Sequence, residues 1–306
     1  MTPPPSDAEL AASESAPLCA APDPSPRPPR RPLPAGACDC HAHICGPAAK
    51  FPYAPGRIYT PPDALLPAYR AMLETLGLER AVLVQPSVYG TDNRVLLGAL
   101  EEMGGAARGV AVVEPEIGED ALQRLDEAGV RGVRLNLVDV KDPTGVLPLD
   151  AARALAERIG GRGWHMELLA HVDETPDLDA QFADFPVDIV FGHLGYFRPG
   201  QNPDIPGFQA LLRLLARGRA WVKLTGPYRI SRTGVPYADV DPFARALFAA
   251  APERIVWGSD WPHVMVKGEM PNDGALCDIL RDWAGDEATL EKVLVTNPEA
   301  LYGFSD

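Results

Sequence analysis

The segment CDCHAHICGP, residues 38–47, holds three cysteines and two histidines within ten positions. Its beginning reads as a β-strand, in which successive side chains point to opposite faces. Alternation would then give two sets, with Asp39, His41 and His43 on one face and Cys38, Cys40 and Ala42 on the other. The cysteines are predicted to pack against the helix layer, and the histidines to carry chemistry. A Cys/His zinc knuckle needs a turn between two ligand pairs, which this spacing does not provide.

Outward from this segment, short apolar runs alternate with longer amphipathic stretches. The amphipathic stretches at 61–77, 148–160 and 207–218 are typical of helices, and a last one covers 286–304. The predicted strands are 37–43, 80–86, 109–115, 132–138, 164–170, 188–194, 220–226 and 254–260.

Eight strand-then-helix units predict parallel strands and an α/β fold, and their number and length fit a (β/α)8 TIM barrel. A doubly wound open sheet is the alternative. That fold favours a glycine-rich phosphate loop after the first strand, and the sequence has none there.

Residues 1–36 contain eleven prolines among alanine, serine and charged residues. Such a composition forms neither a helix nor a strand ladder and buries little, so we expect a disordered, proline-rich arm. Residues 37–306 then form the barrel domain.

The chain of 306 residues has a formal charge of −14 and a pI of about 4.9. This charge disfavours nucleic acid and anionic membranes as partners, although local arginines can still bind a small anionic substrate. The five cysteines do not resemble a disulfide framework, and no apolar stretch has the length of a membrane span. We therefore expect a cytoplasmic protein. Oligomeric state is not readable from the sequence.

Polar residues recur where the predicted strands end, which is where barrel enzymes build their active sites. These residues are His41 and His43 after the first strand, Ser87 after the second, Arg134 in the fourth, His193 after the sixth, Arg229 after the seventh, and Asp260 and His263 after the eighth. A polar rim on one end of the barrel is hard to explain by packing alone, and it predicts a site there.

Five motifs, DCHAHICGP, GHLGYFRP, VKLTGPYRIS, VWGSDWPH and NPEALYGF, occur in this order from residue 39 to residue 304. Together they resemble the amidohydrolase superfamily and, within it, the 2-pyrone-4,6-dicarboxylate lactonase family. The resemblance implies a metal-independent hydrolase that opens a lactone bearing carboxylates, with no cofactor. It implies that Asp260 is the base that activates water, and that His41, His43 and His193 hydrogen-bond the lactone carbonyl and the developing oxyanion. Arg134 and Arg229 would bind carboxylates, assisted by Ser87, Tyr59 and His263.

One feature departs from that family's pattern. The family places a further basic side chain after the fourth strand, whereas here Asp139 intrudes and Lys141 is the nearest cation. Related lactones, including sulfonated muconolactones and sugar-acid lactones, therefore remain open as substrates.

Two rival interpretations use the same residues. His41, His43, Asp260 and either His171 or His193 could hold one zinc or manganese ion, whose bound water would then attack the substrate of a metal-dependent hydrolase or decarboxylase. A two-metal site is disfavoured because the fourth strand has no lysine for a bridging carbamate, and Lys223 in the seventh strand is assigned a structural role. The other rival is a barrel that binds an anion without catalysis.

Overall fold

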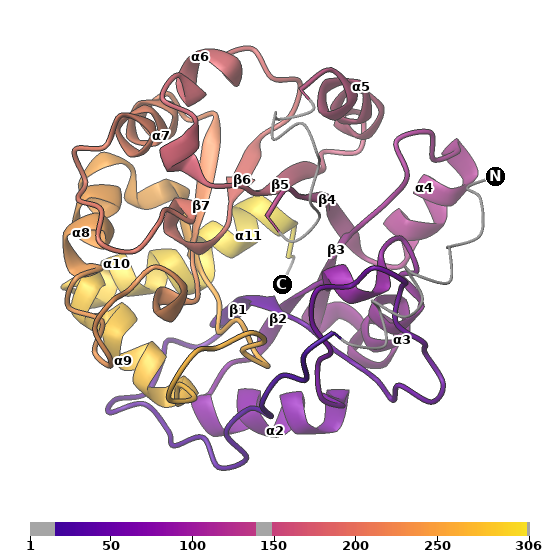
Figure 1. Ribbon diagram of the computed structural model, residues 1–306, viewed down its shortest axis with the longest axis horizontal. Coiled ribbons are helices and arrows are strands. Elements are labelled where there is room, and N and C mark those ends of the chain that lie inside the picture. Colours follow the sequence, from indigo (N-terminus) through magenta and orange to yellow (C-terminus); the bar gives the residue numbers. More distant parts are fainter. Residues whose placement is uncertain (1–15, 139–148, 305–306) are drawn as a thin grey trace.

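The computed structural model describes residues 16–138 and 149–304. Eight parallel strands form one sheet in sequence order and curl into a ring, with all labelled helices except the last around its outside (Figure 1). The predicted (β/α)8 barrel is confirmed, and every predicted strand is present. The strands are β1 (Cys38–Ala42), β2 (Arg80–Val84), β3 (Ala107–Ala111), β4 (Val130–Asn136), β5 (His165–Leu169), β6 (Ile189–Phe191), β7 (Ala220–Leu224) and β8 (Ile255–Trp257).

The ring closes where the chain leaving β8 meets the end of β1. The amide of Asp260 donates to the carbonyl of His41, and the amide of His43 donates to the carbonyl of Trp261, each over 2.8 Å. Residue 258 must be glycine here, since a Cβ on Gly258 would lie 2.5 Å from the backbone nitrogen of His41. Closure of the barrel therefore places Asp260 beside the two histidines of the first strand.

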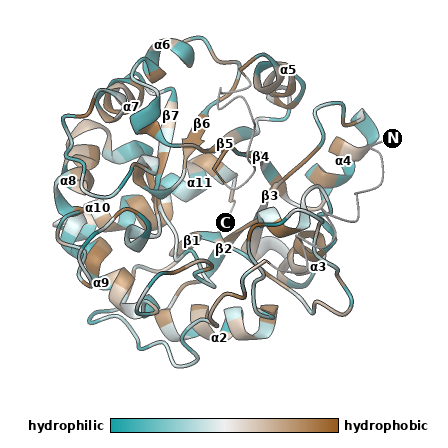
Figure 2. Cartoon of the chain, viewed as in Figure 1, coloured by the Kyte–Doolittle hydropathy of each residue, from teal (hydrophilic) through white to brown (hydrophobic). Residues whose placement is uncertain are grey.

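The helices surround the strands, with one face on the sheet and one in water. In Figure 2 they accordingly carry both hydrophilic and hydrophobic residues. Among the described residues, no helix is long and apolar enough to cross a membrane. The helices are α2 (Leu66–Leu76), α3 (Arg94–Met103), α4 (Glu119–Glu127), α5 (Leu149–Gly160), α6 (Leu178–Gln181), α7 (Pro206–Ala216), α8 (Asp241–Ala250), α9 (Asp273–Ala284), α10 (Glu287–Glu291) and α11 (Asn297–Tyr302).

Two predicted helices have different bounds in the structure. The helix predicted over 61–77 begins only at Leu66, and its last residue is Leu76. Gly77 follows with a left-handed backbone (φ 77°), which ends the helix. The stretch 286–304 is helical without a break from Glu287 to Tyr302, with a π-helical turn at Lys292–Thr296 between α10 and α11.

The first strand corrects the predicted division of its side chains. Its register against β2 shifts between Asp39 and Ala42, which marks a β-bulge, and the Asp39 carboxylate accepts the amide of His41 at 3.1 Å within it. A bulge adds a residue and reverses the alternation beyond it. Asp39 consequently faces α2, where Tyr69 donates to it at 2.9 Å, while Cys40 and His41 both point inward.

The cysteines of β1 are packing residues, as predicted, but they pack on the other side of the strand. Cys38 and Cys40 lie inside the barrel, in a hydrophobic cluster with Leu301, Tyr302 and Phe304 from the C-terminal segment. The end of the chain thus fills the base of the ring, which leaves the opposite end for the polar rim.

The proline-rich arm has a fixed path over residues 16–36. Its arginines Arg27 and Arg30 pair with Asp278 of α9, and Cys19 and Thr60 share a backbone hydrogen bond of 2.8 Å. For these residues the structure gives an arm packed on the barrel in place of the expected disordered tail, because main-chain carbonyls and arginines find partners there. Residues 1–15 lie outside the described part, as do Asp139 and Lys141.

Candidate active site

A small cavity of about 20 Å³ lies at the carboxyl ends of the strands. This volume holds about one water molecule. Six of the predicted site residues line it, and four further residues complete the wall. The lining residues are His43, Tyr59, Arg134, Leu169, His193, Tyr196, Arg229, Asp260, Val264 and Met265.

Asp260 is fully buried and has a left-handed backbone, with φ 67°. Its Oδ2 accepts two short hydrogen bonds, from the hydroxyl of Tyr228 at 2.6 Å and from Nε of Arg229 at 2.7 Å. Among the described residues, its Oδ1 has no hydrogen-bond partner, and it lies 3.6 Å from Nε2 of His41. One carboxylate oxygen is thus anchored and the other is free to bind a ligand.

The charges around Asp260 decide its protonation state. Burial alone would raise the pKa of Asp260, but the positive charge of Arg229 and the neighbouring His193 and His43 outweigh it and bring the pKa well below its ordinary value. Asp260 is therefore ionised at neutral pH. The site therefore lowers the pKa of Asp260 in the protein without substrate.

Three buried imidazoles surround this carboxylate. The ring centroid of His41 lies 4.9 Å from that of His43 and 5.4 Å from that of His193. Burial, with a contribution from Arg134, lowers the pKa of His43 to about 4, and burial lowers that of His193 to about 3. The pKa of His41 is lowered by burial and by the charge of Lys223. All three rings are neutral at pH 7.

Backbone contacts indicate which nitrogen of His43 carries its proton. Nδ1 of His43 lies 2.7 Å from the carbonyl of Val84, which can only accept, so we assign the proton to Nδ1. Nε2 of His43 then presents a lone pair, which accepts a hydrogen bond. The neutral ring is thus unsuited to the donor role that the resemblance implied for it.

The two predicted arginines reach the cavity from opposite sides of the ring. Arg134 is 5% exposed, and its Nε has no hydrogen-bond partner although it lies 3.7 Å from Glu167. Arg229 binds Asp260 through Nε and the carbonyl of Val264 through a terminal nitrogen at 3.1 Å. Two guanidinium groups beside one cavity suit a substrate that carries carboxylates.

The remaining predicted residues lie farther back. Ser87 does not line the cavity but donates to the Tyr59 hydroxyl at 3.4 Å. His263 is fully buried between Tyr228 and Asp273, at 3.1 Å and 2.9 Å. His263 therefore reaches the site only through Tyr228, which itself holds Asp260.

Several residues of the site were not predicted from the sequence. Tyr228 precedes Arg229 in the TGPYRIS motif and could have been proposed from that position, as could Tyr196 in GHLGYFRP. Glu167 has no such signal. Glu167 is an acidic residue in the middle of β5, and only its contact with Lys223, at 2.6 Å, reveals its place beneath the site.

The alternative metal site is present only in part. Ligand atoms of His41, His43 and Asp260 lie within 4.8 Å of one another, a spacing that one ion could bridge. Neither His193 nor His171 belongs to this group, so the four-ligand set is not assembled in the described residues. His171 instead stacks on Tyr196 and contacts its carbonyl at 2.6 Å.

The charges around this group do not fit a divalent cation. Asp260 is already paired with Arg229, and Nδ1 of His41 faces the ammonium of Lys223 at 3.4 Å. A further cation at this place would meet both positive groups, and the one additional carboxylate described nearby, Glu167, is already paired with Lys223 at 2.6 Å.

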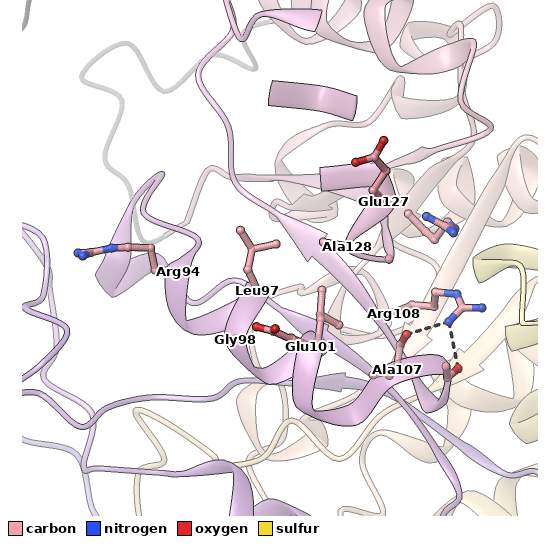
Figure 3. A pocket seen from close by; sticks show the side chains of 13 residues that line it. Arg94, Leu97, Gly98, Glu101, Ala107, Arg108, Glu127 and Ala128 are labelled. Carbon is pink, nitrogen blue, oxygen red and sulfur yellow. Dashed lines mark hydrogen bonds between the residues drawn. The ribbon is translucent and has the colours of Figure 1, made fainter. Parts of the chain in front are cut away.

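A larger cavity of about 740 Å³ lies outside the ring, between α3 and α4 (Figure 3). It is bordered by charged side chains of both signs, among them Arg94, Glu101, Arg108 and Glu127. None of the predicted site residues reaches it.

The fold and the polar cavity at its strand ends define a (β/α)8-barrel enzyme of hydrolytic type. Residues 38–304 match the Amidohydrolase family, and the chain belongs to that family.

Curated relatives cover nearly the whole chain. It is 39% identical to a 2-pyrone-4,6-dicarboxylate hydrolase of Comamonas testosteroni, over 91% of this chain and 93% of that protein. It is 35% identical to a 4-sulfomuconolactone hydrolase of Hydrogenophaga intermedia, over 95% of this chain and 97% of that protein. A solved structure from Pseudomonas putida, described as a 2-pyrone-4,6-dicarboxylic acid hydrolase, is 38% identical and superimposes with a TM-score of 0.75 over 90% of this chain and all of that one. The recognised resemblance is confirmed.

Proposed function

We propose that this protein hydrolyses a lactone that carries at least one carboxylate, using Asp260 as general base and no metal ion. The observation that carries the proposal is the composition of the cavity. One ionised carboxylate lies among three neutral imidazoles and two arginines, Arg134 and Arg229, in a buried site. The relatives named above act on lactones with anionic substituents, which supports the same substrate class.

Two acceptors can orient the attacking water. Asp260 Oδ1 has no hydrogen-bond partner, and Nε2 of His43 presents its lone pair to the same space. A water held by both atoms has its two protons engaged and an oxygen lone pair free for the lactone carbonyl carbon. As the C–O bond forms, Asp260 takes a proton, and the tetrahedral intermediate then collapses with cleavage of the ring C–O bond. The leaving ring oxygen takes up the proton that Asp260 accepted, which restores the carboxylate, and the product is the open-chain acid.

Substrate binding can correct the low basicity of Asp260. The charge of Arg229 is what holds the pKa of this carboxyl low against the effect of burial. A substrate carboxylate on Arg229 would offset that charge, and so would raise the basicity of Asp260 at the time when water is activated.

The developing oxyanion needs donors in a site without bulk water. We assign this role to two buried histidines, His41 and His193. Nε2 of His41 lies 3.6 Å from Oδ1 of Asp260, and His193 lines the cavity. Arg134, whose Nε has no hydrogen bond from the described residues, remains for a second anionic group of the substrate.

The cavity, at about 20 Å³, is much smaller than the pockets that usually enclose a ligand, which have volumes of about 300–1,000 Å³. Rim side chains therefore have to move when substrate binds. Met265 is a candidate, because it lines the cavity and is 39% exposed.

The proposal is tested by measuring metal content and activity together. Protein purified without added metal should contain well below one metal ion per chain and should open 2-pyrone-4,6-dicarboxylate or 4-sulfomuconolactone. A chelator should leave the rate unchanged. About one zinc or manganese per chain, lost together with activity on chelation, would overturn the metal-free mechanism.

That second outcome would favour the other candidate, a mononuclear metal-dependent hydrolase or decarboxylase. The spacing of His41, His43 and Asp260 supports it. The metal would then supply an activated water, and the substrate range would have to be searched again.

A further inference from the structure

Two opposite charges are buried directly beneath the cavity. Lys223 of β7 and Glu167 of β5, two strands that both pair with β6, are 0% and 1% exposed, with Nζ 2.6 Å from Oε2. Removing two charges from water is costly, and a buried ion pair often stabilises a fold no more than apolar residues would. Both residues also contact His41, which suggests that the pair serves the site.

The contact with His41 decides where its ring proton lies. Nζ of Lys223 lies 3.4 Å from Nδ1 of His41 with hydrogen-bond geometry. An ammonium that is paired with a carboxylate has only donors and no lone pair. Nδ1 must therefore accept this hydrogen bond, and the proton of the neutral ring belongs on Nε2.

The opposite side of the ring supports the same assignment. Nε2 of His41 and Oδ1 of Asp260 face each other at 3.6 Å, and neither has another partner. With its proton on Nε2, His41 donates toward that oxygen. With the proton on Nδ1, two lone pairs would oppose each other there, and an N–H would point at the ammonium of Lys223.

Glu167 offers the competing arrangement. Its Oε1 lies 3.5 Å from Nδ1 of His41. In metal sites, a ligating histidine commonly donates its other N–H to a carboxylate, which leaves a lone pair for the metal. Glu167 is in the place for that role, and Lys223 prevents it by occupying Nδ1 as a donor.

We propose that Lys223 is a positioning residue that fixes His41 as the Nε2–H tautomer, so that His41 acts as a hydrogen-bond donor in the cavity and not as a metal ligand. The inference rests on the proposed metal-free function and names the residue that enforces it. In this protein the charge of one lysine side chain then selects whether His41 binds the oxyanion or a metal ion.

The first test is the tautomer of the unaltered protein. ¹⁵N NMR of histidine-labelled protein, with the His41 signals identified by their absence in His41→Gln, distinguishes a protonated from an unprotonated Nε2. We expect a protonated Nε2 and an unprotonated Nδ1. A proton on Nδ1 would overturn the inference, and this measurement does not depend on any variant of Lys223 folding.

The second test changes the lysine. Lys223→Met removes the donor and keeps the length of the side chain, and Lys223→Arg keeps the positive charge as the matched control. In Lys223→Met, His41 should move its proton to Nδ1, donate to Glu167 and gain zinc affinity by roughly 10- to 100-fold, the usual effect of such outer partners. Lys223→Arg should keep the original tautomer and the weak zinc binding.

Zinc binding is measured by calorimetry and by elemental analysis after dialysis, and circular dichroism reports folding. If Lys223→Met is unfolded because Glu167 is left unpaired, the double variant Glu167→Gln/Lys223→Met removes both charges and takes its place. Unchanged zinc affinity in a folded variant would refute the role of Lys223. Tightly bound metal in the unaltered protein would instead refute the proposed function, so the two failures are distinguishable.

Discussion

The small cavity at the strand ends carries the buried charges, whereas the much larger cavity between α3 and α4 carries exposed ones. The cavity at the strand ends has a volume of about 20 Å³. The larger cavity between α3 and α4, called the groove from here on, has a volume of about 740 Å³ (Figure 3). In the small cavity, Arg134 and Asp260 are at most 5% exposed. In the groove, the Arg94 side chain is 63% exposed and Arg131 29%.

The cavity at the strand ends is therefore the candidate site because its charges are buried, although its volume is the smaller one. Charges in the small cavity interact through little water, so Arg229 changes the pKa of Asp260 and Lys223 orients His41. Charges in the groove are screened, and exposed ion pairs contribute about 0–1 kcal/mol. Matched substitutions in the two places test this comparison.

The largest effect is expected for Asp260→Asn. The amide cannot take a proton from water, so kcat should fall by about 10²-fold or more, while substrate still binds. Steady-state kinetics on the lactones named above measure this. The matched groove variant Glu127→Gln should keep full activity. Unchanged turnover in Asp260→Asn would remove this residue from the mechanism.

Arg134→Met should have the next largest effect. It removes a charge-assisted contact with a substrate carboxylate, which contributes about 1.5–3 kcal/mol, so kcat/KM should fall by roughly 10- to 100-fold, mainly through KM. Arg131→Met in the groove removes the same charge and should change kcat/KM by less than about twofold. Equal losses in both variants would contradict a specific site for Arg134.

Stability should fall as the pH decreases below about 6.5. In the unfolded chain, His43 and His193 take up protons near pH 6.5, whereas burial lowers their pKa values in the folded protein to about 4 and about 3. The unfolded state then binds more protons than the folded state. The free energy of unfolding therefore falls by roughly 1–2 kcal/mol per histidine between pH 6.5 and 5. Asp39, whose pKa burial raises to about 6, opposes part of this change.

Urea unfolding at pH 7 and pH 5 measures this dependence. His43→Gln should reduce the difference between the two pH values, and Arg131→Met in the groove should leave it unchanged. A difference that is the same in all three proteins would show that the buried histidines do not set it.

The smallest effect is expected from the proline-rich arm. Ala16, Pro17 and Cys19 bind Thr60, next to Tyr59 of the cavity wall, and Sγ of Cys19 accepts the amide of Met265 at 3.4 Å. Deleting residues 1–19 removes contacts of about 0.5–1.5 kcal/mol each, so KM should rise by roughly two- to fivefold.

Deletion of residues 1–15 is the control, because it retains every one of these arm contacts. Equal KM values would show that the arm does not position the cavity wall.

Much of the fold followed from local patterns in the sequence. Runs such as RAVLV and AWVKL, separated by amphipathic stretches, can only be buried strands between covering helices, and eight of them define the ring. Polar residues placed after such strands must gather at one end, which is why Asp260, His193 and Arg229 were found without a structure.

Tertiary structure alone decided how those residues face one another. The bulge in β1 depends on Asp39 binding Ser259, 220 positions away, so alternation within the strand could not reveal that His41 turns inward beside Cys40. The low pKa of Asp260 and the pairing of Glu167 with Lys223 arise between strands that are distant in sequence. Periodicity is a local property of the chain, whereas the register of a closed barrel and the electrostatics of a buried site depend on which distant residues the closure brings together.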